Sequence, residues 1–297
     1  MALMKYRRIR ISLAVLFTAI LFASSLIVIT TSISGGSSQY KTVESAVLHT
    51  PNNGSLLDET TTQGTATSEN WAGYLVASSL SNPQPVFYEV DGSWIVQTPA
   101  GHFIGTETHS SQWIGIGGWF SNTLIQVGTE SNAHNYYQNS YYAWYEMLPT
   151  STQAGNSSNV KITSLTVHSG DVIDASISEY QSSSEWTIYI QDISTGQSYQ
   201  NNFHYTPDMK SAEWIEERPT VNGNYANLAN FGTAYFGPQY TSGYYNRAYD
   251  TNGYIYDINS LPYYAISMYD SSGTLMASPS SLGSDGNSFT VTWHSST

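Results

Sequence analysis

The chain has no cysteine among its 297 residues, and charged side chains make up only 10% of it. Without cysteine there is no disulfide framework, no catalytic thiol and no thiolate metal site. Lysine and arginine are scarce, with nine in the whole chain against 22 aspartates and glutamates. Proteins that bind nucleic acid need such cations to neutralise phosphates, so this composition argues against a nucleic-acid partner.

The sequence also lacks the short motifs that mark many hydrolases. It has no His-Glu-x-x-His pair of metal ligands, no Gly-x-Ser-x-Gly elbow, and no Asp-Thr-Gly or Asp-Ser-Gly. Its seven histidines are scattered, which argues against a dedicated metal site. We therefore expect neither a metal nor any other cofactor.

Charge is distributed unevenly along the chain. Four of the nine basic residues precede the first apolar run, and after residue 40 five basic residues face 22 acidic ones, a formal charge of about −17 at pH 7. A surface poor in lysine is suited to low pH, because its carboxylates take up protons at low pH and stop repelling one another. We expect an acidic working environment; an ordinary acidic exported protein is the alternative.

The N-terminal region predicts export. Residues 1–34 combine a basic start with a mostly apolar, uncharged run over residues 11–30, long enough to span a bilayer. The basic flank places the rest outside the cell, so we expect a protein that is secreted or anchored to the outer face of the membrane through this run. Residues 35–68 are rich in Ser, Thr and Gly and predict a linker or pro-segment, and residues 69–297 predict the main domain.

Strand signals dominate the main domain. Apolar residues alternate with others at period two in Trp186–Ile190 and in Phe289–Trp293, and turn clusters such as Ser194–Gly196 separate such stretches. No long amphipathic helix is evident. Many short strands with Gly, Asn and Ser turns indicate an all-β fold, a sandwich or a barrel.

A series of aromatic and polar blocks runs through this domain. In order they are Glu69–Tyr74, Ser111–Gly118, Leu124–Gly128, Tyr142–Pro149, Gly170–Ile173, Asp192–Gln197 and Ser211–Glu217. Their order and spacing over about residues 69 to 240 resemble the glutamic peptidases, the eqolisin family. That family hydrolyses peptide bonds in acid with a Gln/Glu pair and no metal. The resemblance implies an endopeptidase for polypeptide substrates, which we expect to be a monomer. It also implies a sandwich of two curved antiparallel sheets, jelly-roll or concanavalin-like, whose concave sheet binds peptide.

The resemblance places Gln126 and Glu213 at the catalytic positions. Residues near the cleft, in substrate binding or in support of the catalytic pair, would be Trp71, Trp113, Trp144, Glu146 and Glu130. A carboxylate can take a proton from water and return it to the leaving amine, and a glutamine amide can hydrogen-bond the oxyanion and orient the water. The plainer alternatives are a solvated edge carboxylate for Glu213 and a buried structural glutamine for Gln126.

The residues of the last block, Ser211–Glu217, can be assigned to the two faces of a strand. If residues 212–217 form a strand, Glu213, Ile215 and Glu217 share one face, and Trp214 and Glu216 share the other. We expect Glu213 to face the concave sheet and Trp214 to pack between the sheets.

The chain departs from the family pattern in the polar residues around the pair. Fungal members usually carry Asp where this chain has Gly117, Glu130 and Tyr142, and they have disulfides. These changes leave the cleft specificity open.

Other functions fit the same strand pattern. A lectin-like sandwich could bind or cleave carbohydrate, with Trp and Tyr platforms and Glu146 paired with Glu213 as the two carboxylates of a glycosidase. A glycosidase has no need of the Gln126 block, which separates these hypotheses. A non-catalytic adhesion module is the third alternative.

Overall fold

The computed structural model describes residues 47–51, 54–59, 62–100, 107–135, 138–149 and 159–297. Every described residue belongs to one compact unit, Glu44–Thr297. The expected export segment, residues 1–34, lies outside the described residues and stays a prediction. Within the described ranges, no helix is both long and apolar enough to cross a membrane.

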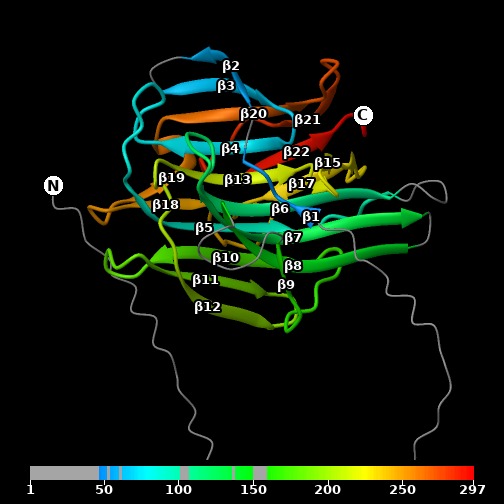
Figure 1. Ribbon diagram of the computed structural model, residues 1–297, viewed down its shortest axis with the longest axis horizontal. Coiled ribbons are helices and arrows are strands. Elements are labelled where there is room, and N and C mark those ends of the chain that lie inside the picture. Colours follow the sequence, from blue (N-terminus) through cyan, green and yellow to red (C-terminus); the bar gives the residue numbers. More distant parts are fainter. Residues whose placement is uncertain (1–46, 52–53, 60–61, 101–106, 136–137, 150–158) are drawn as a thin grey trace, which may run out of the picture. The chain divides into compact units, whose positions relative to one another are not determined.

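The first layer of the fold is a long, mostly antiparallel run of strands that spans Figure 1 from its upper edge to β8 and β9. In order of pairing these strands are β2 (Ser55–Glu59), β3 (Gln63–Ser68), β20 (Tyr263–Tyr269), β4 (Trp71–Ala77), β13 (Ser211–Glu217), β6 (Thr108–Gly117), β7 (Leu124–Asn135), β8 (Gln138–Leu148) and β9 (Val160–Ile162). We call this run the first sheet layer.

The second layer packs behind the first. It runs β12 (Ser198–His204), β11 (Glu185–Asp192), β10 (Val172–Glu179) and β5 (Phe87–Ile95), and β5 also pairs with β17 (Thr233–Phe236) and β18 (Arg247–Asp250). It continues from β17 through β22 (Phe289–Trp293) to β21 (Leu275–Pro279), which pairs with β20 and so joins the two layers. The remaining short elements are β19 (Ile255–Asp257), β16 (Asn227–Leu228), the 3₁₀ turn η1 (Ile258–Ser260) and the separate sheet of β1 (Val47–Leu48), β14 (Thr220–Val221) and β15 (Asn224–Tyr225).

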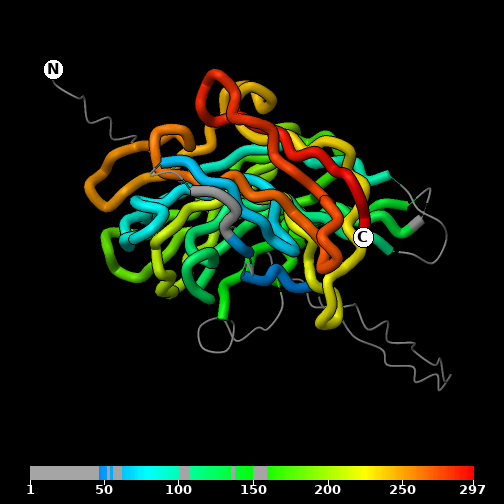
Figure 2. The backbone as a smooth tube through the Cα atoms, turned by 90° about the horizontal axis from the view of Figure 1, so that it is seen from above, coloured from blue at the N-terminus to red at the C-terminus, as the bar shows by residue number. Residues whose placement is uncertain are grey.

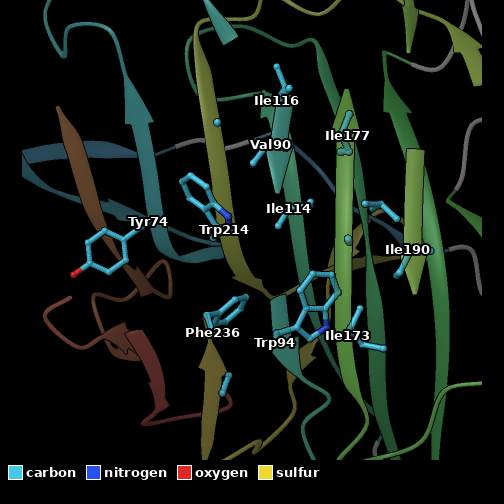
Figure 3. Close-up of a cluster of buried hydrophobic side chains, with 14 of the residues drawn as sticks. Tyr74, Val90, Trp94, Ile114, Ile116, Ile173, Ile177, Ile190, Trp214 and Phe236 are labelled. Carbon is cyan, nitrogen blue, oxygen red and sulfur yellow. The ribbon is translucent and has the colours of Figure 1, made fainter. Parts of the chain in front are cut away.

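The main core lies between the layers, as Figure 3 shows. Ile114 and Trp214 point into it from the first layer, and Trp94 and Ile177 meet them from the second, all fully buried. The Trp214 indole N–H donates to the backbone oxygen of Asp91 at 2.8 Å, so burial leaves no unpaired donor there. The all-β sandwich and the inward position of Trp214 are therefore confirmed.

The structure describes part of residues 35–68, for which the sequence predicts a linker or pro-segment. The described part of this range contains β1, β2 and β3, and β3 lies within the first layer between β2 and β20. Strands from the beginning and the end of the chain thus lie side by side, blue and cyan next to orange in Figure 2. Residues in β3 alternate between exposed and buried, but the buried ones include Gly64, Ala66 and Ser68, which carry too little apolar surface to reveal a strand.

Candidate active site

The first layer has an outer face, opposite the main core, that gathers the predicted site residues. Directly paired residues of neighbouring strands share a face, because side chains alternate along each strand. On this face they form three rows: Glu213, Gly115, Gln126 and Glu146; then Ile215, Trp113, Gly128 and Trp144; then Glu217, Ser111, Glu130 and Tyr142.

The floor of this face is a second hydrophobic cluster that includes Trp71, Trp113 and Trp144, all fully buried. The rings of Trp71 and Trp113 meet edge to face at 4.9 Å. Gly128 lets the floor close, since a Cβ there would lie 2.6 Å from the Trp113 Cβ and 2.4 Å from the backbone oxygen of Gln112. A side chain at this position would therefore push the floor apart.

The segment Val47–Thr50 crosses this floor, and its backbone engages Gln126 and Glu146. The Gln126 Nε2 donates to the His49 carbonyl oxygen at 3.3 Å and to Glu146 Oε2 at 3.3 Å. The His49 backbone N–H donates to the same Glu146 oxygen at 3.1 Å. Gln126 Oε1 is buried without a partner. These contacts fix an extended backbone over the pair Gln126 and Glu146.

Glu217 holds the other side of the same segment. Its carboxylate accepts hydrogen bonds from the Trp113 indole N–H at 2.7 Å, the Thr50 backbone N–H at 3.2 Å and the Asn70 side-chain amide at 3.3 Å. The His49 Nδ1 lies 3.0 Å from Glu217 Oε2. The peptide bond between His49 and Thr50 is thus held between Gln126 and Glu217.

The His49 ring fills a closed pocket. It stacks on Trp144 with ring centroids 3.6 Å apart and planes 4° from parallel. The Asn159 Nδ2 donates to His49 Nε2 at 3.0 Å, and Glu130 Oε2 lies 3.8 Å from the same nitrogen. Burial lowers the pKa of His49 to about 4, so the ring is neutral at pH 7.

Burial also raises the pKa values of the carboxyl groups in the site. It raises the pKa of Glu146 to about 8 and the pKa of Glu217 well above its usual value, although the hydrogen bonds from Trp113 and Asn70 oppose the second shift. The ionised form of a carboxyl is disfavoured where water is excluded. With Val47–Thr50 in place, the site therefore holds protons that it would release on opening to water.

Glu213 lies in the same row as Gln126, but Gly115 separates them, and the two side chains share no hydrogen bond. Neither Glu213 oxygen has a hydrogen-bond partner, although Ser211 lies near enough to lower its pKa in part. Burial nevertheless raises the pKa of Glu213 well above its usual value, and the nearby charge of Asp208 adds to the shift. Gln126 and Glu213 thus lie on the same face of the first layer, one strand apart, with no direct hydrogen bond between them.

Gly117 stands where the resemblance implied an aspartate, and a neighbouring carboxylate takes up the space. A Cβ at Gly117 would lie 2.9 Å from Asp208 Oδ1, and the backbone φ of +90° is one that glycine adopts freely. Asp208 comes from the loop before β13, so a carboxylate is present there from a different part of the chain.

The structure brings most of the predicted site residues to one face and adds several that the sequence did not single out. Trp144, Gln126 and Glu146 contact the bound segment. Trp113 donates to Glu217, and Glu130 lies 3.4 Å from His109 Nδ1. The added contact residues are His49, Asn70, Asn159 and Glu217. Among the described residues, no group of His, Asp and Glu could hold a metal ion.

Comparison with known families agrees with this geometry. Residues 69–276, more than half of the chain, match the Peptidase A4 family. The protein is thus a hydrolase, a peptidase of the glutamic type. The chain belongs to the Peptidase A4 family, which sets aside the carbohydrate-active and adhesion alternatives.

Solved structures show the same fold at low sequence identity. Scytalido-glutamic peptidase with a transition-state analogue inhibitor is 18% identical with a TM-score of 0.59. The eqolisin SCP-B in complex with the tripeptide Ala-Ile-His is also 18% identical, with a TM-score of 0.55. Each alignment covers 76% of this chain and 98% of the other. No curated protein matches the sequence at a significant level.

Proposed function

We propose that the protein is an acid endopeptidase that hydrolyses polypeptides with Gln126, a glutamate of β13 and an activated water. The observation that carries this proposal is the peptide bond between His49 and Thr50. Its carbonyl oxygen accepts a hydrogen bond from Gln126, and its nitrogen donates one to Glu217. The site therefore binds the backbone of an extended peptide at the two atoms that peptide hydrolysis changes.

Each group has a role that follows from its position. Water adds to the carbonyl carbon, the C–N bond breaks, and the leaving nitrogen gains a proton. The Gln126 amide stabilises the negative charge on the carbonyl oxygen, and a carboxylate takes the proton of water and passes it to the nitrogen. Glu146 accepts a hydrogen bond from Gln126 and so orients its amide.

The contacts favour Glu217 over Glu213 as this carboxylate. Glu217 accepts a hydrogen bond from the nitrogen that would leave, and Trp113 holds its other oxygen in place. Glu213 reaches neither end of that peptide bond through any hydrogen bond. The expectation of a Gln126–Glu213 pair stays as the competing assignment.

Acid activity and an extracellular location belong to the same proposal. A glutamate exposed to water has a pKa of about 4.3, so a base of this type remains partly ionised in acid. The scarcity of lysine and the carboxyl-rich chain fit that environment. We expect activity on casein to peak between about pH 2 and 5.

Single substitutions decide whether Glu217 or Glu213 is the catalytic carboxylate. Glu217→Gln and Gln126→Ala should each lower kcat by about 10²–10³-fold or more on a quenched peptide at pH 4. Glu213→Gln should lose far less. Glu216→Gln is the matched control, because Glu216 lies on the opposite face and accepts from Gln97 at 3.0 Å. Circular dichroism checks folding in each case.

Two results would count against the proposal. A folded Glu217→Gln variant with full activity and an inactive Glu213→Gln variant would restore the competing assignment. If both variants cleave as fast as the wild type, no glutamate of β13 is catalytic.

A further inference from the structure

Strand β12 forms an open edge of the second layer, and among the described strands it pairs with β11 alone (Figure 1). On one flank, the Gln197 backbone oxygen accepts from the Asp192 N–H at 2.9 Å. On the other flank, the Tyr205 N–H donates to the Ser184 oxygen at 3.0 Å. In an antiparallel strand both backbone groups of a residue point to the same side, and this side alternates along the strand. The odd-numbered residues of β12 therefore bond to β11, and the groups that face the open edge belong to Ser198, Gln200, Asn202 and His204.

The edge of β12 lacks the usual protection against pairing. Native sheet edges are commonly protected by charged residues, proline, a bulge or a very short strand. β12 has seven residues, contains no Lys, Arg, Asp, Glu or Pro, and keeps an unbroken register with β11. The edge strands of the first layer differ from it. β9 has only three residues, including Lys161, and the register of β2 with β3 shifts between Leu56 and Asp58.

We propose that β12 is a dimerisation edge, where a second copy of the chain adds its own β12 in antiparallel register about a two-fold axis at Asn201. Gln200 then lies opposite the partner's Asn202, and Ser198 lies opposite the partner's His204, so the edge-facing backbone groups pair with one another. The same surface serves both copies, as two-fold symmetry requires. This dimer replaces the expectation of a monomer. It does not rest on the proposed function, because β12 lies in the second layer.

The side chains of β12 are complementary to themselves in this register. On the face towards the first layer, Tyr199 lies opposite the partner's Phe203. Both rings are half-buried and contact the Tyr145 ring, with centroids 5.9 and 4.8 Å away. On the other face, the Gln200 amide lies opposite the amide of the partner's Asn202. Aromatic and amide contacts thus continue across the axis.

Charge favours a second copy as the occupant. The chain has a formal charge of −13 at pH 7, so two copies repel each other over much of their surface. β12 carries no acidic residue, so two such chains can meet there, and a basic partner would find no carboxylate on this strand. Pairing replaces one contact of the single chain, the 2.9 Å hydrogen bond from the Asn202 N–H to Asn201 Oδ1.

Single cysteines test the axis directly, because the chain has none of its own. In the full chain, Asn201→Cys places two thiols opposite each other at a Cα separation of about 4.5 Å, which a disulfide can bridge. Gln200→Cys is the matched control, since it is also exposed but its two copies lie diagonally, about 7–8 Å apart. With copper phenanthroline at pH 7, Asn201→Cys should form covalent dimers at least about tenfold faster than Gln200→Cys.

Two further measurements test the register and the backbone contacts. A mixture of Gln200→Cys and Asn202→Cys chains should form covalent heterodimers, because these two positions lie opposite each other. Adding Gln200→Pro to Asn201→Cys should abolish the covalent dimer, because proline removes an N–H that faces the partner and none that faces β11. Adding Gln200→Ala instead should leave the dimer in place.

Each outcome decides a part of the proposal. Equal rates for Asn201→Cys and Gln200→Cys would overturn the dimer, and a faster rate for Gln200→Cys would overturn the axis at Asn201. Covalent dimers that persist with Gln200→Pro would overturn the pairing of the strands. If circular dichroism shows that the proline variant is unfolded, the mixture of Gln200→Cys and Asn202→Cys decides, and its failure to cross-link overturns the pairing.

Discussion

Protonation of His49 is expected to weaken the hold of the site on the segment Val47–Thr50 as the pH falls. Burial lowers the pKa of His49 from 6.5 to about 4 in the closed state. A lowered pKa means that the bound form prefers the neutral ring, so its contribution is complete above pH 6.5 and is lost as the pH falls towards 4. The difference of about 2.5 units corresponds to about 3 kcal/mol, or about 300-fold in the ratio of open to closed forms.

The two carboxyls that face the segment act in the opposite sense, because they bind protons more tightly in the closed form. Glu217 lies at Nδ1, Glu146 at the backbone N–H, and Glu130 at Nε2, with His109 beyond Glu130. Burial raises the pKa of Glu146 to about 8 and the pKa of Glu217 well above its usual value, so both carboxyls hold protons in the closed form and give the imidazolium little negative charge to pair with. The contribution of His49 is therefore measured as a difference from a variant that lacks the imidazole. The charge of Glu130 opposes release and the charge of His109 favours it.

The assay follows a dye on the segment. Because the chain has no cysteine, Val47→Cys places a single label at β1. Relative to a His49→Phe variant, its fluorescence should shift towards the open form between about pH 6.5 and 4. His49→Phe is the matched control, since phenylalanine stacks on Trp144 but does not titrate. If the wild type and His49→Phe respond identically from pH 7 to 3, the reasoning is refuted.

Three further outcomes are expected. First, stability to urea should be greatest below about pH 4.5 and should fall towards pH 8. Burial raises the folded-state pKa of Glu146 to about 8, so this group favours the folded form only while it is protonated. A stability that rises from pH 4.5 to 8 would contradict the raised pKa. Secondly, Gly128→Ala should cost about 1–3 kcal/mol in urea denaturation through overpacking of the Trp113 floor, and an unchanged midpoint would mean that the floor yields. Thirdly, EDTA should leave activity on casein unchanged; a loss reversed by a divalent ion would overturn the proposed chemistry.

The sandwich could be predicted because its buried faces are strongly apolar. Trp186, Ile188 and Ile190 alternate along β11 and are all fully buried, as a period-two pattern requires. The strands before residue 69 could not be predicted in the same way. Their buried positions include serine, glycine and alanine, and β3 is held by pairing to β20, 200 residues later.

The site was only partly accessible from the sequence for a related reason. Gln126 and the three tryptophans occur in recognisable blocks on long strands, so their common face follows from strand parity. His49 lies outside any such block, and its contacts reach Glu146 and Glu217, 97 and 168 residues away. No local pattern encodes contacts of that separation.

The alternation of side chains along β13 does not distinguish Glu213 from Glu217 as the catalytic residue. Both point to the outer face of β13, four residues apart, which is about 13 Å along a strand. Parity therefore admits either, but only one of them can reach a given peptide bond. The proposal of Glu217 therefore depends on its neighbours, because the donors from Trp113 and Asn70 can stabilise its ionised form once water enters. Glu213 lacks such donors, and burial together with the nearby charge of Asp208 raises its pKa well above the usual value.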